Sequence, residues 1–449
     1  MPQPDTLGRV RARIWLSLAI ALLAGPAGAS AHSILQAVGE TSGAGVRLSY
    51  SAPVEEAFVR ITTLDGHPVA AFVDPADAQI IVTPGVTGAE PDLRWRVLSR
   101  DGHVTEGRIN LTPSPRGNAT SSRRSPLSIP SDVLAFAALL GLIGMLGVRF
   151  VVIAPTWRTG GTRPPGTGAA DAWRRVLGPS LDRGIRAWWI TWWCLVGAAG
   201  FGLACGVIGL LSELDSTDIG TLSGTRWGVA WVTQVAGLCI AAAVSALLFR
   251  SSSRDAPDPA RQWGYGIAIP LGIAAAGISW AGHASARTDA GIGIGLDAIH
   301  LSATGIWLGG LAALLAIVPR ARRGLSDADA TRFAAAVVVR FSTVAILCVA
   351  TLVVTGVYRA IAELTAFNDL GDTGYGRALL VKLIVFSVLL IGGVFNRLVL
   401  HPRLERAALG LRETDGGAGH TLRISLAAEI AGAVVLLVVV GVLVNLPPP

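Results

Sequence analysis

The fold of this chain is decided by its long apolar stretches, and the last of them, residues 424–446, reads ISLAAEIAGAVVLLVVVGVLVNL. Glu429 is its single charged residue. About 20 apolar residues are enough to cross the hydrocarbon core of a bilayer as an α-helix. Because no water is available there to hydrogen-bond an open backbone, such a segment crosses as a helix. The stretch therefore predicts a transmembrane helix close to the C-terminus.

Seven further stretches of this kind precede it. Together the eight run roughly over Val133–Ala154, Ala187–Leu211, Trp227–Phe249, Gly264–Ala281, Ile292–Val318, Phe333–Val357, Ala378–Asn396 and Ile424–Leu446. The chain is 51% hydrophobic and only 15% charged, whereas soluble domains carry about 25% charged residues. This composition excludes an ordinary soluble enzyme, a disordered chain and a fibrous chain. We expect an all-α polytopic membrane bundle of about eight transmembrane helices over residues 131–449.

The first 31 residues have the features of an export signal. Arg9, Arg11 and Arg13 form a positive region, residues 14–23 are apolar, and Ala29-Ser30-Ala31 is a small-residue cleavage site. Cleavage there would leave His32 as the new amino terminus, and the following segment would fold outside the cytoplasm. The alternative is an uncleaved anchor.

Residues 32–112 read as a series of short strands, and Val46–Tyr50 among them alternates apolar and polar residues. Alternation of this kind is typical of half-buried strands. The segments are Val46–Tyr50, Phe58–Ile61, Ile80–Val82, Leu93–Val97 and Arg108–Leu111. Several short strands at this spacing predict a small all-β sandwich. Residues 113–130, rich in Ser, Pro and Arg, are expected to form a linker.

The basic residues indicate how the bundle lies in the membrane. If the β domain is outside, the first span runs inward and four loops are cytoplasmic, namely residues 155–186, 250–263, 319–332 and 397–423. These loops hold 18 Arg, and the three external loops between spans hold 4. Cytoplasmic loops are enriched in Lys and Arg, so the C-terminus is expected outside as well. The net charge of +7 thus reports topology, and no nucleic-acid partner is expected beside the lipid bilayer.

A candidate metal site lies in the β domain at Asp101-Gly102-His103. Residues two apart in a strand share a face, so Asp101 and His103 can reach one ion if this segment is extended. After cleavage, His32 would add an amino and an imidazole nitrogen. Nitrogens with a carboxylate in a tetragonal arrangement suit Cu(II), whereas Met and Cys, absent from residues 32–112, would favour Cu(I). The alternative is a solvated histidine in a turn.

This part of the chain resembles the CopC family of periplasmic copper-binding proteins. The resemblance is carried by His32 after Ala29-Ser30-Ala31, by Leu48-Ser49-Tyr50-Ser51 and by Trp95-Arg96-Val97-Leu98-Ser99-Arg100-Asp101-Gly102-His103. It implies a Greek-key β-sandwich that binds Cu(II) through His32, Asp101 and His103. The family often has an acidic residue just after the Ser of the early strand. This chain has Ala52 there, with Glu55 and Glu56 slightly later.

The spans resemble the CopD family of inner-membrane copper proteins over most of residues 131–447. The matching pieces are Asp297–His300, Trp307–Gly310, Arg340–Ser342, Gly374–Arg377, Lys382 and Asn396–Arg397. The resemblance implies copper uptake or handling, often beside or fused to a CopC domain. It also implies that the protein lies in the bacterial cytoplasmic membrane.

A second candidate metal site lies within the spans. Asp297 and His300 are three residues apart and share one helix face, and His283 ends the preceding span. Charged groups inside a span are costly and usually functional or paired. The three residues could form a metal entry site beneath the β domain. The alternative is a hydrogen-bonded structural pair in the bundle.

Other polar and soft side chains in the spans have weaker functional signals. For Lys382 and Glu429, snorkelling or local pairing is expected. Cys194 and Cys205 share a helix face and could relay Cu(I), although buried Cys more often acts as a small hydrophobe.

The prediction is therefore a copper transport or homeostasis protein, not an enzyme, that captures Cu(II) outside and passes it to the spans. No nucleotide-binding loop is present, so no nucleotide partner is expected. A copper chaperone and a reductase are left open. The alternatives are copper sequestration or sensing without transport, a haem protein using His283 and His300, and an oxidative polysaccharide monooxygenase built on His32.

Overall fold

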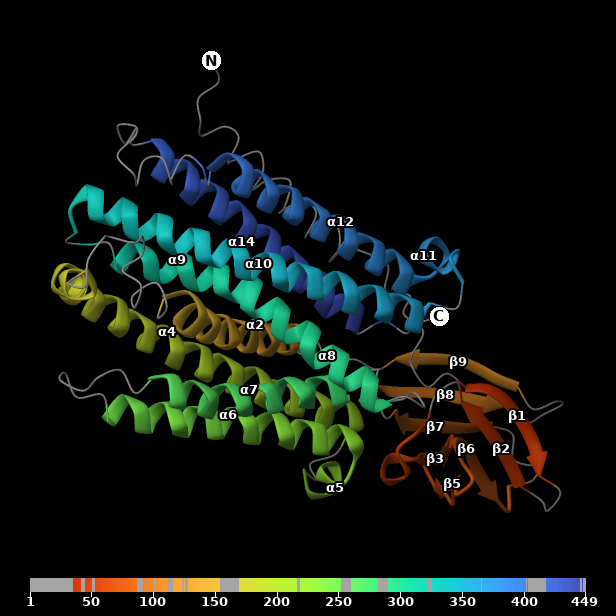
Figure 1. Ribbon diagram of the computed structural model, residues 1–449. Coiled ribbons are helices and arrows are strands. Elements are labelled where there is room, and N and C mark those ends of the chain that lie inside the picture. Colours follow the sequence, from red (N-terminus) through yellow and green to blue (C-terminus); the bar gives the residue numbers. More distant parts are fainter. Residues whose placement is uncertain are drawn as a thin grey trace.

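The chain forms a helical bundle with a small β domain at one end (Figure 1). The computed structural model describes residues 35–41, 45–50, 53–86, 92–99, 102–110, 116–122, 125, 128–153, 169–215, 219–251, 260–281, 290–321, 323, 325–364, 366–400, 402, 417–444 and 446. The expected signal peptide, 1–31, lies outside the described residues, as do His32, Asp101 and His283.

The bundle consists of long helices, three of which contain a π-helical turn. They are α2 (Ser128–Gly147) with η2 (Val148–Ile153), α4 (Ala169–Leu214), α6 (Arg226–Ser251), α7 (Ala260–Ala281), α8 (Ala290–Thr304) with η4 (Gly305–Gly309) and α9 (Gly310–Ala321), α10 (Asp327–Glu363), α12 (Gly374–Phe395) with η5 (Asn396–Leu400), and α14 (Gly417–Val444). Two short helices, α5 (Ile219–Ser223) and α11 (Asp369–Asp372), lie in connections at the β-domain end (Figure 1).

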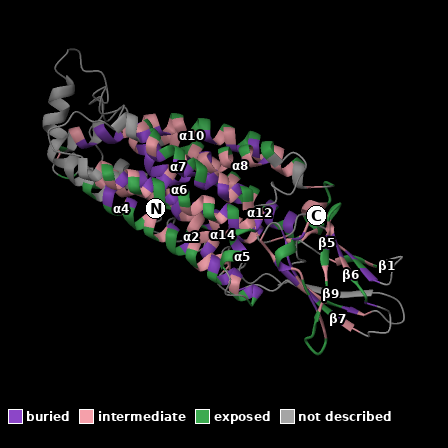
Figure 2. Ribbon diagram, turned by 90° about the horizontal axis from the view of Figure 1, so that it is seen from below, coloured by how far each residue is buried: buried purple, intermediate pink, exposed green. Residues whose placement is uncertain are grey.

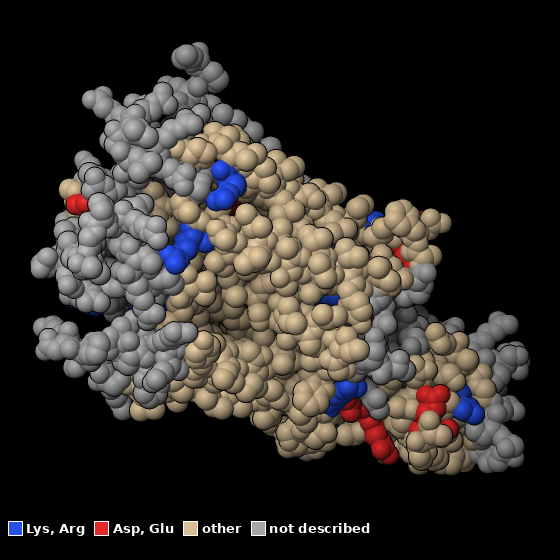
Figure 3. All heavy atoms as spheres, viewed as in Figure 1, with Lys and Arg blue, Asp and Glu red and all other residues tan. Residues whose placement is uncertain are grey.

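The expected eight spans are confirmed. Among the described residues, eight helical segments are long and apolar enough to cross a membrane: Ser128–Ile153, Trp188–Leu214, Arg226–Leu248, Gly264–Ala281, Gly291–Arg320, Phe333–Ile361, Gly374–Val399 and Ile424–Val444. Their bounds differ from the sequence expectation by only a few residues at most ends. On the face shown in Figure 3 the middle of the bundle is largely uncharged.

Large apolar side chains cover the outside of the bundle. Figure 2 shows exposed and half-buried residues along the outer helices. Those more than half exposed include Ile190, Phe201, Leu347, Val354 and Ile391. In water such a surface would be costly, whereas lipid tails solvate it. This surface identifies the multi-pass membrane domain independently of the hydropathy of the sequence.

Helix α2 is the centre of the bundle. It packs against α4, α9, α14 and η4, and 61% of its span is buried, against 22% for α10 and α12. Gly144 makes this packing possible, because a Cβ there would overlap the backbone of Gly309 and Gly310. Small residues that let two helix backbones approach closely are typical of membrane interfaces.

We expect Gly144→Ala to lower the thermal stability of the bundle, because the added methyl group must push η4 away from α2. Over-packing a close contact typically costs about 1–3 kcal/mol. The measurement is the unfolding temperature of the purified protein in detergent. Gly197→Ala on α4 is the matched control, since a Cβ at Gly197 meets nothing within 4 Å. Equal unfolding temperatures for the two variants would contradict the prediction.

The β domain is the expected sandwich. One antiparallel sheet has the order β1-β2-β6-β5 and the other β4-β3-β7-β8-β9. The strands are β1 (Leu35–Thr41), β2 (Gly45–Tyr50), β3 (Arg60–Thr63), β4 (Pro68–Val69), β5 (Phe72–Asp74), β6 (Asp77–Pro84), β7 (Asp92–Leu98), β8 (Val104–Asn110) and β9 (Arg116–Ser122), with a 3-10 turn η1 (Glu56–Phe58) before β3. The chain crosses between the sheets after β2, β4 and β6.

The core of the sandwich comes from the apolar positions of both sheets. Leu48 and Ile81 from one sheet and Leu93 and Ile109 from the other are completely buried. Tyr50 meets Trp95 edge-on, with ring centroids 5.2 Å apart. Aromatic pairs prefer this geometry. The expected segments therefore correspond to β2, β3, β6, β7 and β8, whereas β1, β4 and β5 were not expected and Phe58 ends the 3-10 turn η1 instead of starting a strand.

The region expected to be a linker differs from that expectation. Residues 116–122 form β9 and pair with β8, and α2 already begins at Ser128. The stretch is Arg-Gly-Asn-Ala-Thr-Ser-Ser, which has no apolar alternation to indicate a strand. Its pairing comes from backbone hydrogen bonds to β8, which any sequence without proline can make.

The β domain is docked on the ends of α4, α5 and α6. Phe58, Leu98 and Val104 of the β domain share one buried cluster with Val207, Leu210, Leu214 and Leu222 of the helices. Polar contacts also join the described residues of the two domains. Glu55 Oε1 accepts a hydrogen bond from the Arg226 backbone N–H at 3.1 Å, and Arg96 pairs with Asp215 at 2.6 Å. Within the β domain, Arg96 also pairs with Glu106 at 2.9 Å.

Candidate functional site

His103 stands at the end of a tight turn between β7 and β8. The Ser99 N–H donates to the His103 carbonyl and the Gly102 N–H donates to the Ser99 carbonyl, both at 2.9 Å. Gly102 has φ +86°, the left-handed region that glycine enters without steric cost. Asp101 and His103 were expected to share a strand face if the segment between them is extended. Gly102 is not extended, so this condition is not met there.

Gly102 also sets where this turn sits. A Cβ at Gly102 would overlap the indole ring of Trp227 in the first turn of α6. The turn thus contacts the membrane domain directly, and this contact restricts where the next residue, His103, can lie. Glycine was visible in the sequence, but its contact with Trp227 was not.

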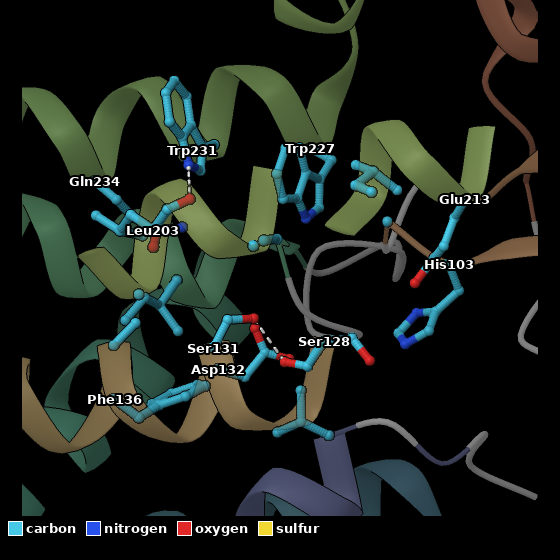
Figure 4. A pocket seen from close by; sticks show the side chains of 18 residues that line it. His103, Ser128, Ser131, Asp132, Phe136, Leu203, Glu213, Trp227, Trp231 and Gln234 are labelled. Carbon is cyan, nitrogen blue, oxygen red and sulfur yellow. Dashed lines mark hydrogen bonds between the residues drawn. The ribbon is translucent and has the colours of Figure 1, made fainter. Parts of the chain in front are cut away.

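His103 lines a cavity of about 150 Å³ between the β domain and the bundle. Figure 4 shows its side chain at one side of this space, next to Glu213. The lining residues are Gly102, His103, Ser128, Ser131, Asp132, Ala135, Phe136, Gly202, Leu203, Gly206, Leu210, Glu213, Trp227, Trp231, Gln234, Ile278, Ala281 and Val444. All except Gly102 and His103 come from helices α2, α4, α6, α7 and α14.

Several polar groups in the cavity wall are held in place by hydrogen bonds. Glu213, which is 7% exposed, accepts from the Ser125 N–H at 2.5 Å. Ser131 Oγ donates to the Ser128 carbonyl at 2.8 Å, and Trp231 Nε1 donates to the Leu203 carbonyl at 3.0 Å (Figure 4). These contacts give the wall a defined shape.

The second candidate site has a different environment from the one expected. Asp297 and His300 lie three residues apart on α8, as predicted, and both face α10. Asp297 Oδ1 is 3.1 Å from Arg359 Nε, and His300 Nδ1 is 2.8 Å from Thr355 Oγ1. Sequence reasoning missed both α10 partners. Thr355 and Arg359 are four residues apart and therefore lie on the same face of α10. This spacing is the signal in the sequence that both could contact the same neighbouring helix.

This cluster carries positive charge close to the histidine. Arg359 and Lys382 both act electrostatically on His300. The described residues include no group of three or more His, Cys, Asp or Glu side chains placed to hold a metal ion. A ligand role for Asp297 would require Arg359 to move away. The set His283, Asp297 and His300 stays a prediction, since His283 lies outside the described residues.

Glu429 shows the local pairing that was expected for it. Its carboxylate accepts a hydrogen bond from Asn396 Nδ2, and Asn396 Oδ1 accepts one from Ser425 Oγ at 2.7 Å. Of the two cysteines considered for a relay, Cys194 is exposed on the outside of α4 and Cys205 is half-buried.

These features define a class: a multi-span membrane protein with a β-sandwich docked over a cavity at the end of its bundle. Comparison with known families adds two matches. Residues 35–113 match the CopC domain and residues 335–443 match copper resistance protein D, CopD. One polypeptide thus carries both domains, as the sequence resemblance predicted. Asp297 and His300 precede the CopD match, whereas Lys382, Asn396 and Arg397 lie within it.

Two curated proteins are similar to this chain. The copper transport protein CutJ of Bacillus subtilis strain 168 is 26% identical over 98% of this chain and 78% of its own length. The copper resistance protein D of Pseudomonas syringae pv. tomato is 27% identical over 50% of this chain and 69% of its own length. No solved structure matches the chain. Both relatives carry copper transport or copper resistance in their names.

Proposed function

We propose that this protein captures Cu(II) outside the cytoplasm with its β domain and passes it to the membrane domain for uptake. One observation carries the proposal: His103, a ligand by the CopC resemblance, lines a cavity whose other walls are transmembrane helices. An ion released from His103 would therefore meet the ends of the transmembrane helices directly.

The proposed ligands are His32, Asp101 and His103. A free amino terminus and an imidazole from His32, with a second imidazole and a carboxylate, form a donor set that suits the tetragonal preference of Cu(II). The amino nitrogen becomes available only if the signal peptide is removed after Ala31. Copper is the transported substrate in this scheme.

The proposed orientation has the β domain and the C-terminus on the outer side of the bacterial cytoplasmic membrane. It is supported by the 18 Arg in the four loops of one side against 4 in the loops of the other. It also agrees with the arrangement of the helices, since Val444 at the end of α14 lines the same cavity as His103.

Uptake of copper by proteoliposomes tests the proposal. We expect the protein to move externally added Cu(II) to an encapsulated copper indicator, and His103→Ala to lower the rate by at least about tenfold, since even weaker changes around a metal cost that much in affinity. His67→Ala is the matched control, because His67 lies in an exposed turn of the same domain.

The same experiment separates uptake from the second candidate function. Copper that binds the purified wild-type protein at His103 without entering the liposomes would favour sequestration or sensing. In that case the transport proposal is wrong and the capture site remains.

A further inference from the structure

The cavity beneath His103 has two carboxylates on its membrane side. Asp132 comes from the first turns of α2, and Glu213 from the last turn of α4. Ser131 and Gln234 add a hydroxyl and an amide. Figure 4 shows Glu213 beside His103, and Asp132 beside Ser131 on α2. His103 of the β domain and the two carboxylates of the bundle thus line the same cavity.

We propose that this cavity is a transfer chamber, in which Asp132 and Glu213 draw copper from the β domain into the bundle as Cu(II). This inference rests on the proposed uptake function and adds to it the residues that receive the ion and the oxidation state in which it crosses the domain interface.

The charge of the wall favours a cation. None of the described residues that line the chamber is Lys or Arg. Arg96, a cation at the docking interface, is paired with Asp215 and Glu106. Acids in a cleft with low-dielectric walls concentrate cations, because the field is focused between the walls. The carboxylates of Asp132 and Glu213 therefore attract a cation to the chamber.

The donor atoms indicate the oxidation state. The chamber offers carboxylate, amide and hydroxyl oxygens and an imidazole, and its described lining contains no Met or Cys. Thioether and thiolate groups select Cu(I), whereas nitrogen and oxygen donors suit Cu(II). An ion that leaves His103 therefore meets no group here that would favour its reduced form, and any reduction belongs to a later step.

The size of the chamber suits transit. A volume of about 150 Å³ is well above the roughly 10–15 Å³ that a cavity needs to hold one water, which is room for an ion that keeps part of its hydration shell. The described residues include no set of three His, Cys, Asp or Glu side chains close enough to enclose a metal. Conduction needs binding that is strong enough for entry and weak enough for release, and this wall meets that need.

The test is copper uptake by proteoliposomes that contain full-length protein, with Asp132→Asn, Glu213→Gln and the double variant. We expect the double variant to lose at least about tenfold in rate, by analogy with other changes around a metal, while its β domain still binds stoichiometric Cu(II) with an unchanged electron paramagnetic resonance spectrum. Glu213→Gln keeps an oxygen that can accept from the Ser125 N–H, and Asp132→Glu, which keeps the charge, should retain uptake. These two variants together distinguish loss of charge from misfolding.

Asp372→Asn is the matched control, because Asp372 is an exposed acid on α11 that does not line the chamber. Double-variant uptake equal to that of this control, with His103→Ala still defective, would overturn the chamber and leave the proposed uptake intact. Absence of uptake by the wild type would overturn both.

The oxidation state has its own measurement. Uptake from Cu(II) should be unchanged when a membrane-impermeant chelator specific for Cu(I) is present outside. Inhibition by that chelator, with no effect on empty liposomes, would show that copper passes the interface reduced and would overturn the assignment of Cu(II).

Discussion

Asp297→Ala is expected to lower the free energy of unfolding by about 3 kcal/mol, the low end of the cost of breaking a buried ion pair. The Asp297 carboxylate is 9% exposed and lies 3.1 Å from Arg359. The variant removes this counter-charge from a guanidinium that is only 32% exposed. The measurement is equilibrium unfolding of the purified protein in mixed detergent micelles.

The double variant Asp297→Ala/Arg359→Ala should recover much of this loss, because the charge left behind by the single variant is also removed. Ile299→Ala is the control on the same helix, since Ile299 is an exposed side chain on α8. Unchanged stability of Asp297→Ala together with lost copper uptake would contradict the structural role and favour the metal entry site.

Gly102→Val is expected to reduce copper uptake by at least about tenfold, as far as His103→Ala does. The valine Cβ would overlap the Trp227 ring, so the turn must lift away from α6 and carry His103 away from the chamber. The measurement is again uptake of Cu(II) by proteoliposomes.

Gly66→Val is the control that distinguishes the effect of losing this contact from the effect of backbone strain. Gly66 has φ +86°, the same value as Gly102, and a Cβ there meets nothing within 4 Å. A non-glycine residue at such a φ costs of order 1–3 kcal/mol in either place, but only Gly102→Val displaces the β domain from the bundle. Equal uptake by the two variants would show that the contact with Trp227 is unimportant for transfer.

Most of the architecture was predictable because its causes are local. A span such as Ile424–Val444 is recognisable because each of its residues separately favours lipid over water. The strand around Leu48 and the strand around Trp95 are recognisable because alternation shows which face is buried. β9 was missed because its residues are polar and its pairing depends on the backbone of β8.

The candidate sites were predictable only in part. The motif around His103 predicts that residue as a copper ligand, which stays a prediction, and the spacing of Asp297 and His300 placed both on one face of α8. The partners of these residues could not be foreseen. Glu213 follows His103 by more than a hundred residues, and Arg359 lies in the span after the one that holds Asp297.

The sequence by itself thus determined the eight spans and the β domain before them, because each depends on the composition or the alternation of short segments. Only the tertiary structure decided that the β domain sits on α4, α5 and α6, that His103 opens on a cavity with Asp132 and Glu213, and that Asp297 is paired with Arg359. The physical reason is that these contacts arise from how separately stable segments pack, and packing depends on shape and charge that meet only after the chain has folded.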